Sequence, residues 1–183
     1  MKVYFVTCNK NKVREVQEIF GDKHKVEQLP IDYPELRSDY AEEIAKMAAK
    51  QLADKLKKPL FVEDSGLFIK ALDGLPGTSS AYIHKRIGLK GILKLMKGVK
   101  DRECAYVSAV AYCEPGKKPV SFVGSEKGRI SDKIKGKNGF GHDPIFIPEK
   151  SKKTYGEIDN VEKEKKFRRL AVVKLLRYLE RKA

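Results

Sequence analysis

A strand that passes directly into a helix opens the chain, and it constrains the fold more than any other segment. The apolar residues Val3–Val6 favour a buried strand, and apolar positions over residues 13–20 recur at helical spacing. Between them lies only the short polar and basic segment Thr7–Lys12. A tight loop at a helix N-terminus presents free backbone N–H groups and the positive end of the helix dipole, which favours an anion such as phosphate.

The side chains of this loop suit the same task. Thr7 and Asn9 are able to hydrogen-bond a phosphate, and Lys12 in the first turn adds a full positive charge. The segment lacks the glycine-rich pattern of a Walker loop. The alternative interpretation is an ordinary strand-to-helix turn with a solvated lysine. Cys8 has no histidine close in sequence to activate it, so we interpret it as a small loop residue.

The composition predicts a single globular domain over residues 1–183. The chain is 41% hydrophobic and contains no low-complexity segment. Its three cysteines lack metal-ligand spacing and cannot all pair internally, so we expect reduced thiols in a cytoplasmic protein. The longest uncharged stretch, residues 104–113, is too short to span a bilayer, and the first residues lack the features of a signal peptide. We therefore expect no membrane association.

The charge balance predicts an anionic partner without identifying it. The net charge is +14 and the pI is near 9.6. Both nucleic acid and a polyphosphate small molecule fit such an excess. A third interpretation is the solvated surface of a heat-adapted protein, because 35% of the residues are charged. Charge alone does not choose among the three.

Alternating strand and helix patterns predict an α/β fold with a mixed sheet. The expected helices cover residues 13–20, 41–58 (with a D-x-x-E start at Asp39), 88–96 and 161–179. The expected strands cover residues 3–6, 60–62, 67–72, 105–113, 120–123, 126–131 and 145–147. Turns are expected at Ser65-Gly66 and at residues 114–117, the latter closing a hairpin.

An acidic pair marks a second candidate site. Glu63 and Asp64 follow a short apolar strand and precede a glycine turn, a position suited to facing a cleft. Successive side chains of a strand alternate in direction, so one acid can hold Mg²⁺ while the other polarises a water. Glu35, in an extended segment after Pro34, is a third candidate. The alternative for all three acids is a solvated position on a turn or loop.

Further candidates lie in two glycine loops and in the basic tail. Residues 74–80 form a Gly-Pro loop whose backbone N–H groups suit a phosphate, or an ordinary turn. In the loop 139–144, Phe140 and His142 are flat side chains able to stack on a base, next to Asp143. The alternative places Phe140 in the core and His142 on the surface. The run 162–169 is interpreted as a solvated helix face, a nucleic-acid patch or a phosphate clamp.

Taken in order, these segments resemble the family of inosine/xanthosine triphosphate pyrophosphatases. The resemblance runs from Val3 to the final helix. Its motifs are T-x-N-x-x-K from Thr7, P-E at Glu35, E-D-S-G-L from Glu63, G-L-P-G from Gly74, F-G-x-D-P from Phe140, T-Y-x-E from Thr154 and E-K at Glu162.

The resemblance implies both a reaction and an architecture. The reaction is hydrolysis of non-standard purine nucleoside triphosphates (ITP, XTP and dITP) to the monophosphate and pyrophosphate, which cleans the nucleotide pool. The implied fold is two-lobed, around a long twisted mixed sheet with flanking helices, with the nucleotide in the cleft between the lobes. Mg²⁺ dependence and a homodimer are also implied.

The resemblance further assigns roles to individual residues. Thr7, Asn9 and Lys12 would bind the triphosphate, with charge stabilisation from Lys12, Lys163 and Mg²⁺. Asp64 would orient or deprotonate the attacking water. The remaining assignments are Glu35, Glu63 and Asp64 as metal ligands, and Ser65, Phe140, His142, Asp143, Arg168 and Arg169 as further substrate contacts.

Several departures from the family pattern gather on the base-binding side. The family's Ser-His-Arg motif is replaced by Phe167, Arg168 and Arg169, of which Arg168 remains a donor whereas Phe167 cannot replace a hydroxyl. Glu164 stands where Asn is usual, Ser79 where Tyr is usual, and His142 where Tyr or Trp is usual. Loss of a base-reading hydrogen bond relaxes or shifts discrimination.

Two alternative functions follow. The first is a pyrophosphatase with a shifted or relaxed base preference. The second is a non-catalytic nucleic-acid-binding domain that uses the positive charge of the chain. The acidic pair argues against the second for the site itself, because without a metal it would repel a phosphate backbone. Nucleic acid is therefore the less favoured partner.

Overall fold

The computed structural model describes residues 2–22, 24–33 and 37–182. These residues divide into two compact units. Unit 1 comprises the described parts of residues 1–64, 108–124 and 167–183, and unit 2 comprises residues 65–107 and 125–166. Three long strands, β3 (Leu60–Ile69), β5 (Glu103–Cys113) and β6 (Val120–Ile130), begin in one unit and end in the other.

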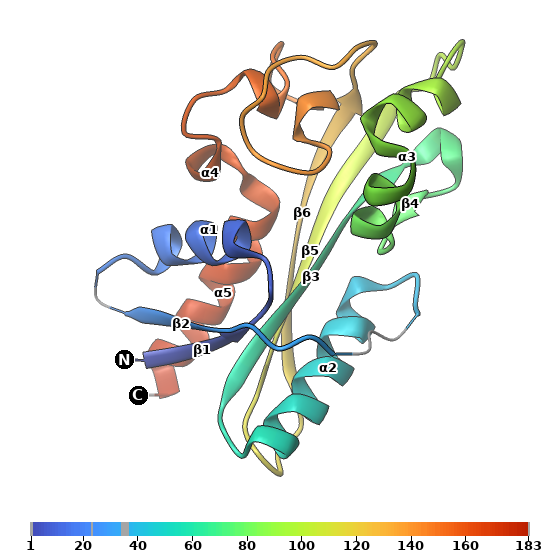
Figure 1. Cartoon of the computed structure of the whole chain (residues 1–183). Coiled ribbons are helices and arrows are strands. Elements are labelled where there is room, and N and C mark those ends of the chain that lie inside the picture. Colours follow the sequence, from blue (N-terminus) through green and yellow to red (C-terminus); the bar gives the residue numbers. More distant parts are fainter. Residues whose placement is uncertain (1, 23, 34–36, 183) are drawn as a thin grey trace. The chain divides into compact units, whose positions relative to one another are not determined.

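The strands form one seven-stranded mixed sheet (Figure 1), which confirms the predicted α/β class. Its order is β2-β1-β3-β5-β6-β7, and β4 pairs with β3. The shorter strands are β1 (Lys2–Val6), β2 (Lys25–Leu29), β4 (Pro76–Gly77) and β7 (Phe146–Pro148). The pairings β1–β2 and β1–β3 are parallel, whereas β3–β4 and β6–β7 are antiparallel. The neighbouring strands β5 and β6 are joined only by residues 114–119. This link is too short for a parallel crossover, so the two strands form an antiparallel hairpin, as predicted.

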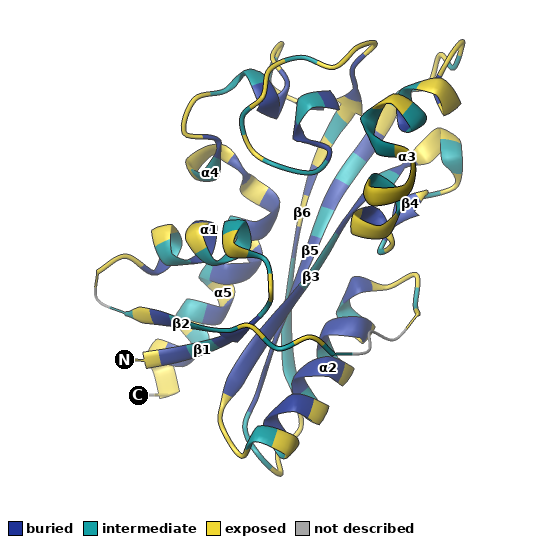
Figure 2. Ribbon diagram, in the orientation of Figure 1, coloured by how far each residue is buried: buried dark blue, intermediate teal, exposed yellow. Residues whose placement is uncertain are grey.

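Unit 1 is a three-layer sandwich in which alternate strand residues pack against different helices. Phe5, Phe61 and Val110 pack in one cluster with α1 (Lys10–Phe20) and α5 (Lys166–Lys182). The neighbouring strand positions, among them Val6 and Val62, pack in a second cluster with α2 (Ala41–Leu56). Figure 2 shows the buried side of α2 turned toward the strands. The period-two alternation of the strands therefore fixes which helices cover which face.

Unit 2 is built from the other ends of the long strands, helix α3 (Ser80–Leu95), β4, β7 and several short helical turns. These turns are η1 (Lys70–Leu72), η2 (Asp143–Ile145), η3 (Tyr155–Glu157) and α4 (Val161–Glu164). The Ser80 hydroxyl, at the start of α3, links β3 to β4 by accepting from the Leu67 N–H at 2.8 Å and donating to the Gly77 carbonyl at 2.7 Å. The Tyr155 hydroxyl donates to Glu126 at 2.5 Å. Buried polar side chains thus hold the loops of this unit.

Two pairs of predicted strands are wrong, because in each case a single strand runs through the residues expected to separate them. β3 continues through Ser65 and Gly66 to Ile69, and residues 70–72 are 3₁₀-helical. Gly66 serves a close approach instead: a Cβ there would lie 2.0 Å from the Gly77 carbonyl oxygen. Likewise, the strands expected over 120–123 and 126–131 are one strand, β6, which pairs alongside the equally long β5.

Three helix predictions need correction. The residue before α2 is Tyr40 and it makes no side-chain cap, so Asp39 is not the N-cap. Helix α3 begins at Ser80, eight residues earlier than expected, and is interrupted at Gly88, where φ is +61°. The tail is two helices, α4 and α5, because Lys165 between them is extended. Backbone interruptions of this kind leave the hydrophobic spacing almost unchanged, so the sequence pattern did not reveal them.

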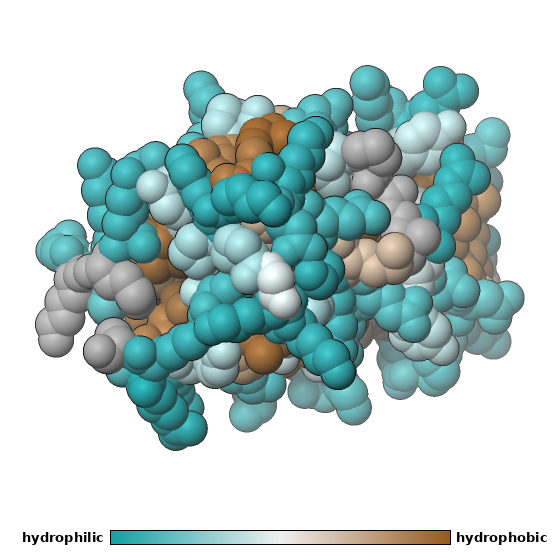
Figure 3. All heavy atoms as spheres, turned by 90° about the horizontal axis from the view of Figure 1, so that it is seen from below, coloured by the Kyte–Doolittle hydropathy of each residue, from teal (hydrophilic) through white to brown (hydrophobic). Residues whose placement is uncertain are grey.

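Hydrophilic side chains predominate on the face shown in Figure 3, and hydrophobic side chains appear there in separate patches. This is the surface expected of a chain with 35% charged residues. Among the helices of residues 2–22, 24–33 and 37–182, none has the length and apolarity needed to cross a membrane.

A buried charge lies within the helix layer of unit 1. Arg168 of α5 is only 2% exposed. Its guanidinium pairs with Glu15 of α1, also buried, and donates to Glu63 Oε1 of β3 at 3.1 Å. The two carboxylates raise the pKa of the guanidinium against the opposing effect of burial. Interpreting the run 162–169 as a wholly solvated face is therefore wrong at Arg168.

The close packing of α5 on β6 predicts that Gly124→Ala destabilises the protein. A Cβ at Gly124 would lie 2.1 Å from the Phe167 carbonyl oxygen and 2.8 Å from the Ala171 nitrogen. Because both are backbone atoms of α5, the helix must move, and we expect a loss of about 1–3 kcal/mol in the free energy of unfolding. Urea denaturation measures it, with Ser125→Ala at the exposed neighbouring position as control. Equal stability of the two variants would contradict this packing.

The buried pairing of Arg168 predicts a larger loss for Arg168→Met. The substitution keeps a long apolar side chain but removes the buried cation that pairs with Glu15. Of the two cations beside Glu63, only Lys12 then remains. Breaking a buried ion pair from one side costs about 3–5 kcal/mol. Arg177→Met, an exposed position of the same helix, is the matched control and should change little. The free energies of unfolding of the two variants decide the matter, and a small loss in both would refute the buried network.

Candidate functional site

The loop between β1 and α1 is organised by its own side chains. Asn9 is the N-cap of α1, and its Oδ1 accepts hydrogen bonds from the backbone N–H groups of Asn11 at 2.9 Å and Lys12 at 3.4 Å. The Asn9 N–H donates to Thr7 Oγ1 at 3.1 Å. Asn is among the preferred N-cap residues for this reason. Since Oδ1 caps the helix, the NH₂ group is the donor that Asn9 offers to a ligand.

Lys12 connects this loop to the acidic pair. Its Nζ lies 2.8 Å from Glu63 Oε2 and donates to the Glu63 carbonyl oxygen at 3.1 Å. The contact bridges residues that are 51 positions apart in the sequence. The predicted phosphate loop and the predicted acidic site are therefore one site within unit 1.

Glu63 is a buried carboxylate held by three partners. It is 5% exposed; it accepts hydrogen bonds from the Ser108 hydroxyl at 2.6 Å and Arg168 Nε at 3.1 Å, and it forms an ion pair with Lys12. Burial raises the pKa of Glu63, but the positive charges of Arg168 and Lys12 outweigh it and lower the pKa to about 2. Glu63 is therefore an anion at neutral pH. Sequence reasoning missed Ser108 and Glu15, since nothing in a strand or helix pattern marks a partner so far away.

Asp64 lies next to Glu63 on β3 and is half-buried, so the two acids differ in accessibility as their alternation predicted. Their placement at the end of a strand is wrong, because β3 continues past them to Ile69. Ser65, half-buried, is the first residue of unit 2. Glu35 lies outside the described residues.

A second group of predicted residues comes together in unit 2 around Asp143. This side chain is 1% exposed, and its Oδ2 accepts from the Phe140 N–H at 2.7 Å and from Lys165 Nζ at 2.7 Å. The Tyr106 hydroxyl donates to Oδ1 at 3.3 Å. Lys165 Nζ also lies 4.1 Å from the centroid of the Phe140 ring, a cation–π contact. Asp143 and Phe140 are thus held in one arrangement.

Sequence reasoning missed Lys165. It stands in a run of lysines and glutamates, and such runs are usually solvated. In the structure Lys165 is 2% exposed, because the backbone leaves the helix there and carries the side chain toward Asp143. Only the break between α4 and α5 distinguishes it from its exposed neighbours Lys163 and Lys166.

His142 is buried, which excludes the surface position considered as the alternative. It is 3% exposed, and its ring meets the ring of His84 of α3 edge to face with centroids 5.1 Å apart. Burial, and then the neighbouring His84, lower the pKa of His142 to about 4. The imidazole is therefore neutral at neutral pH.

The residues of the basic tail separate into different environments. Lys163 is exposed on α4, whereas Arg169 is half-buried on α5. Phe167 is 2% exposed. Sequence reasoning assigned Arg168 to the base, and the structure holds its guanidinium on Glu15 and Glu63 of unit 1.

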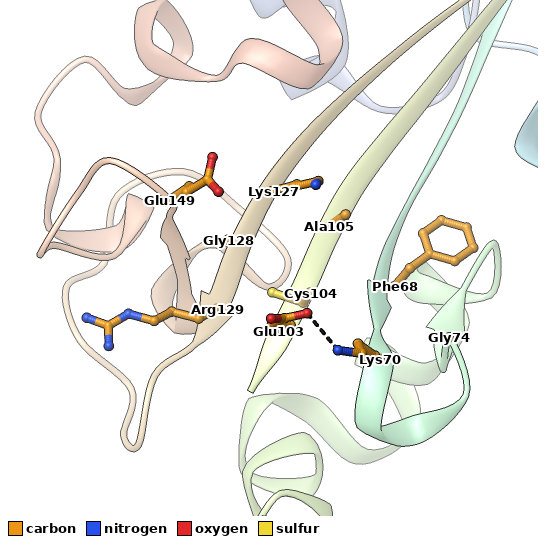
Figure 4. A pocket seen from close by; sticks show the side chains of 10 residues that line it. All are labelled: Phe68, Lys70, Gly74, Glu103, Cys104, Ala105, Lys127, Gly128, Arg129 and Glu149. Atoms are coloured by element: carbon orange, nitrogen blue, oxygen red, sulfur yellow. Dashed lines mark hydrogen bonds and ion pairs between the residues drawn. The ribbon is translucent and has the colours of Figure 1, made fainter. Parts of the chain in front are cut away.

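A surface pocket of about 530 Å³ lies elsewhere on unit 2 (Figure 4). It is lined by residues of β3, β5 and β6, including Phe68, Ala105 and the ion pair of Lys70 with Glu103 at 2.8 Å. Ala105 lines this pocket while the next residue, Tyr106, contacts Asp143, so the two lie on opposite faces of β5. The described lining contains none of the predicted site residues.

Comparison with known proteins finds relatives that match this chain over most of its length. The chain is 49% identical over 164 residues to the dITP/XTP pyrophosphatase of Methanopyrus kandleri, covering 89% of this chain and 87% of that protein. It is 43% identical over 164 residues to the dITP/XTP pyrophosphatase of Pyrococcus horikoshii, covering 89% and 88%. Among solved structures, the Staphylococcus aureus Ham1 protein superposes with a TM-score of 0.86 at 28% identity, over 100% of both chains.

A sequence model described as the Ham1 family matches residues 3–178, nearly the whole chain. The match extends over the β1–α1 loop, the acidic pair on β3, the Asp143 cluster and most of α5. Together with the relatives above, it shows that this chain belongs to the Ham1 family.

Proposed function

We propose that this protein hydrolyses non-standard purine nucleoside triphosphates (ITP, XTP and dITP) to the nucleoside monophosphate and pyrophosphate. The observation that carries the proposal is the contact of Lys12 with Glu63, which joins an anion-binding helix N-terminus to an acidic pair. A cation, a helix N-terminus and carboxylates in one place suit phosphoryl chemistry. The relatives named dITP/XTP pyrophosphatase support the substrate class.

The triphosphate is assigned to the β1–α1 loop of unit 1. Thr7 Oγ1 and Asn9 Oδ1 accept within the loop, so the Thr7 O–H and the Asn9 NH₂ are the donors offered to the phosphates. Lys12 neutralises charge that builds up on the phosphates as the bond breaks. Lys163 of α4 and Ser65 are further proposed contacts. Because Asn9 and Lys12 are already held by the helix cap and by Glu63, little reorganisation is needed on binding.

Magnesium fits the chemistry of the acidic pair. Glu63 and Asp64 are adjacent hard oxygen donors, and Mg²⁺ commonly takes one or two carboxylates with waters and substrate phosphates. Within residues 2–22, 24–33 and 37–182 no cluster of three or more acidic, His or Cys side chains offers a complete cage. Glu35 is the proposed third ligand. When bound, the ion neutralises and orients the phosphate oxygens.

Asp64 is the proposed general base. It is the more accessible of the two acids, whereas the positive charges of Arg168 and Lys12 lower the pKa of Glu63 to about 2, too low for a base at neutral pH. Asp64 takes a proton from a water whose oxygen attacks the α-phosphorus. The bond between that phosphorus and the oxygen bridging to the β-phosphate breaks, and pyrophosphate leaves with the bonding electrons. Arg168 acts as a positioning residue, because its ion pair with Glu63 holds that carboxylate in place.

The base is assigned to the Asp143 cluster of unit 2, with Phe140 as the stacking ring and His142 and Arg169 as further contacts. A specific observation favours the alternative of a shifted base preference. At the three positions aligned with Ser-His-Arg, Phe167 and Arg168 are each 2% exposed. Arg169 is then the residue of this motif that remains to read a base.

The quaternary state and compartment are proposed from the family resemblance. The family's members are usually homodimers, and we extend this to the present chain. A cytoplasmic location agrees with its free thiols, of which Cys8 is exposed and Cys104 and Cys113 are buried.

The proposed reaction predicts metal-dependent release of pyrophosphate. With Mg²⁺ we expect rapid release from ITP, XTP and dITP, slower release from GTP, ATP and dTTP, and loss of activity in EDTA because the phosphate charge is no longer neutralised. Pyrophosphate is quantified directly for each nucleotide. Broad activity across the panel would favour the shifted base preference. The absence of any release would refute the enzyme and leave salt-sensitive nucleic-acid binding as the function to test.

Asp64→Asn tests the general base. It preserves size and removes proton-accepting ability, so we expect kcat to fall by about 10²–10⁴-fold with little change in KM. Asp73→Asn is the matched control, because Asp73 is exposed and adopts a left-handed conformation that Asn tolerates. Steady-state kinetics with ITP compare the two. A kcat for Asp64→Asn within a few-fold of the native value would eliminate Asp64 as the base.

A further inference from the structure

His142 carries a polar atom that unit 2 does not satisfy. The side chain is 3% exposed, and its Nε2 has no hydrogen-bond partner among the described residues. Buried polar atoms are nearly always hydrogen-bonded, so each exception calls for an explanation. A ligand that supplies the missing bond is one such explanation.

The loop that carries His142 is fixed by its neighbours. Asp143, the next residue, is held by the Phe140 N–H at 2.7 Å and by Lys165 at 2.7 Å. The Ile145 N–H donates to the His142 carbonyl at 3.0 Å. The ring of His84 packs edge-on against the imidazole. Since backbone and ring are both restrained, Nε2 keeps a preset position in the interior of unit 2.

The imidazole offers one hydrogen bond rather than a charge. Burial and the nearby His84 lower the pKa of His142 to about 4, so the ring is neutral at neutral pH. In a neutral imidazole each nitrogen is either a donor or an acceptor. A ring nitrogen that carries the proton favours a ligand edge with an acceptor opposite it over one with a donor there.

We propose that His142 Nε2–H donates a hydrogen bond to the keto oxygen of the purine base, which makes His142 a specificity-determining residue. The inference rests on the proposed function, which assigns the base to Phe140 and Asp143 on the same loop. Hypoxanthine and xanthine place a keto oxygen at position 6, where adenine places an amino group. When adenine is bound instead, its amino group and His142 Nε2–H are both donors. No hydrogen bond forms between them, and Nε2 stays without a partner.

His142→Phe keeps a ring and removes the donor, and His142→Gln keeps a donor on a flexible side chain. The measurements are kcat/KM for ITP and ATP, and the inhibition constant of inorganic tripolyphosphate, which has no base. In His142→Phe we expect the ratio of kcat/KM for ITP to kcat/KM for ATP to fall about tenfold or more, because KM for ITP rises. The tripolyphosphate constant should stay within about twofold, and His142→Gln should recover part of the preference. His84→Phe, which keeps the packed ring, should leave the preference unchanged.

An unchanged ITP to ATP preference in His142→Phe, or equal preferences in the Phe and Gln variants, would overturn this inference, since packing alone would then account for His142. Should His142→Phe fail to fold, as judged by thermal unfolding, His142→Leu takes its place. These outcomes differ from failure of the proposed function, in which the native protein itself releases no pyrophosphate from any nucleotide.

Discussion

The carboxylate of Glu63 organises unit 1, because three separate elements reach it. Lys12 comes from α1, Arg168 from α5 and Ser108 from β5. Burying an anion costs several kcal/mol unless its neighbours compensate, and here two cations and a hydroxyl do so. Glu15 balances the second cation, so the buried network of Glu15, Glu63, Lys12 and Arg168 carries no net charge. The position of the β1–α1 loop against the acidic pair follows from this balance of charge.

The same network changes what the C-terminal helix offers to a ligand. At the positions aligned with the family's Ser-His-Arg motif, Phe167 and Arg168 are buried in the interior of unit 1 and are not exposed to a ligand. Under the proposed function, recognition of the base then depends mainly on the loop 139–145 of unit 2. There a second buried pair, Lys165 with Asp143, fixes the stacking ring of Phe140 from one side. Unit 1 thus has a buried charge network around Glu63, and unit 2 has the buried pair of Lys165 with Asp143.

The glycines illustrate why local patterns mislead at such sites. Gly66 looks like a turn after an apolar strand, yet it lies inside β3. The residue there is a glycine because the Gly77 carbonyl approaches too closely for any side chain. Gly124 likewise looks like a strand end, yet α5 packs directly on it. In both cases the glycine is required by a distant segment. Sequence patterns describe neighbours along the chain, so they assign such a residue to a turn, as at Gly66, or to a break between strands, as at Gly124.

The sequence by itself determined the α/β class, the strand–loop–helix start, the acidic pair and the 105–123 hairpin. These depend on side-chain periodicity and on bonds between residues a few positions apart. Only the tertiary structure decided that Lys12, Glu63 and Arg168 meet, that Lys165 and His142 are buried, and that the lysine-rich tail breaks into two helices. The physical reason is that burial and ion pairing of a charged side chain depend on partners from remote segments. A charged residue on a solvated face and one in a buried pair look alike in sequence.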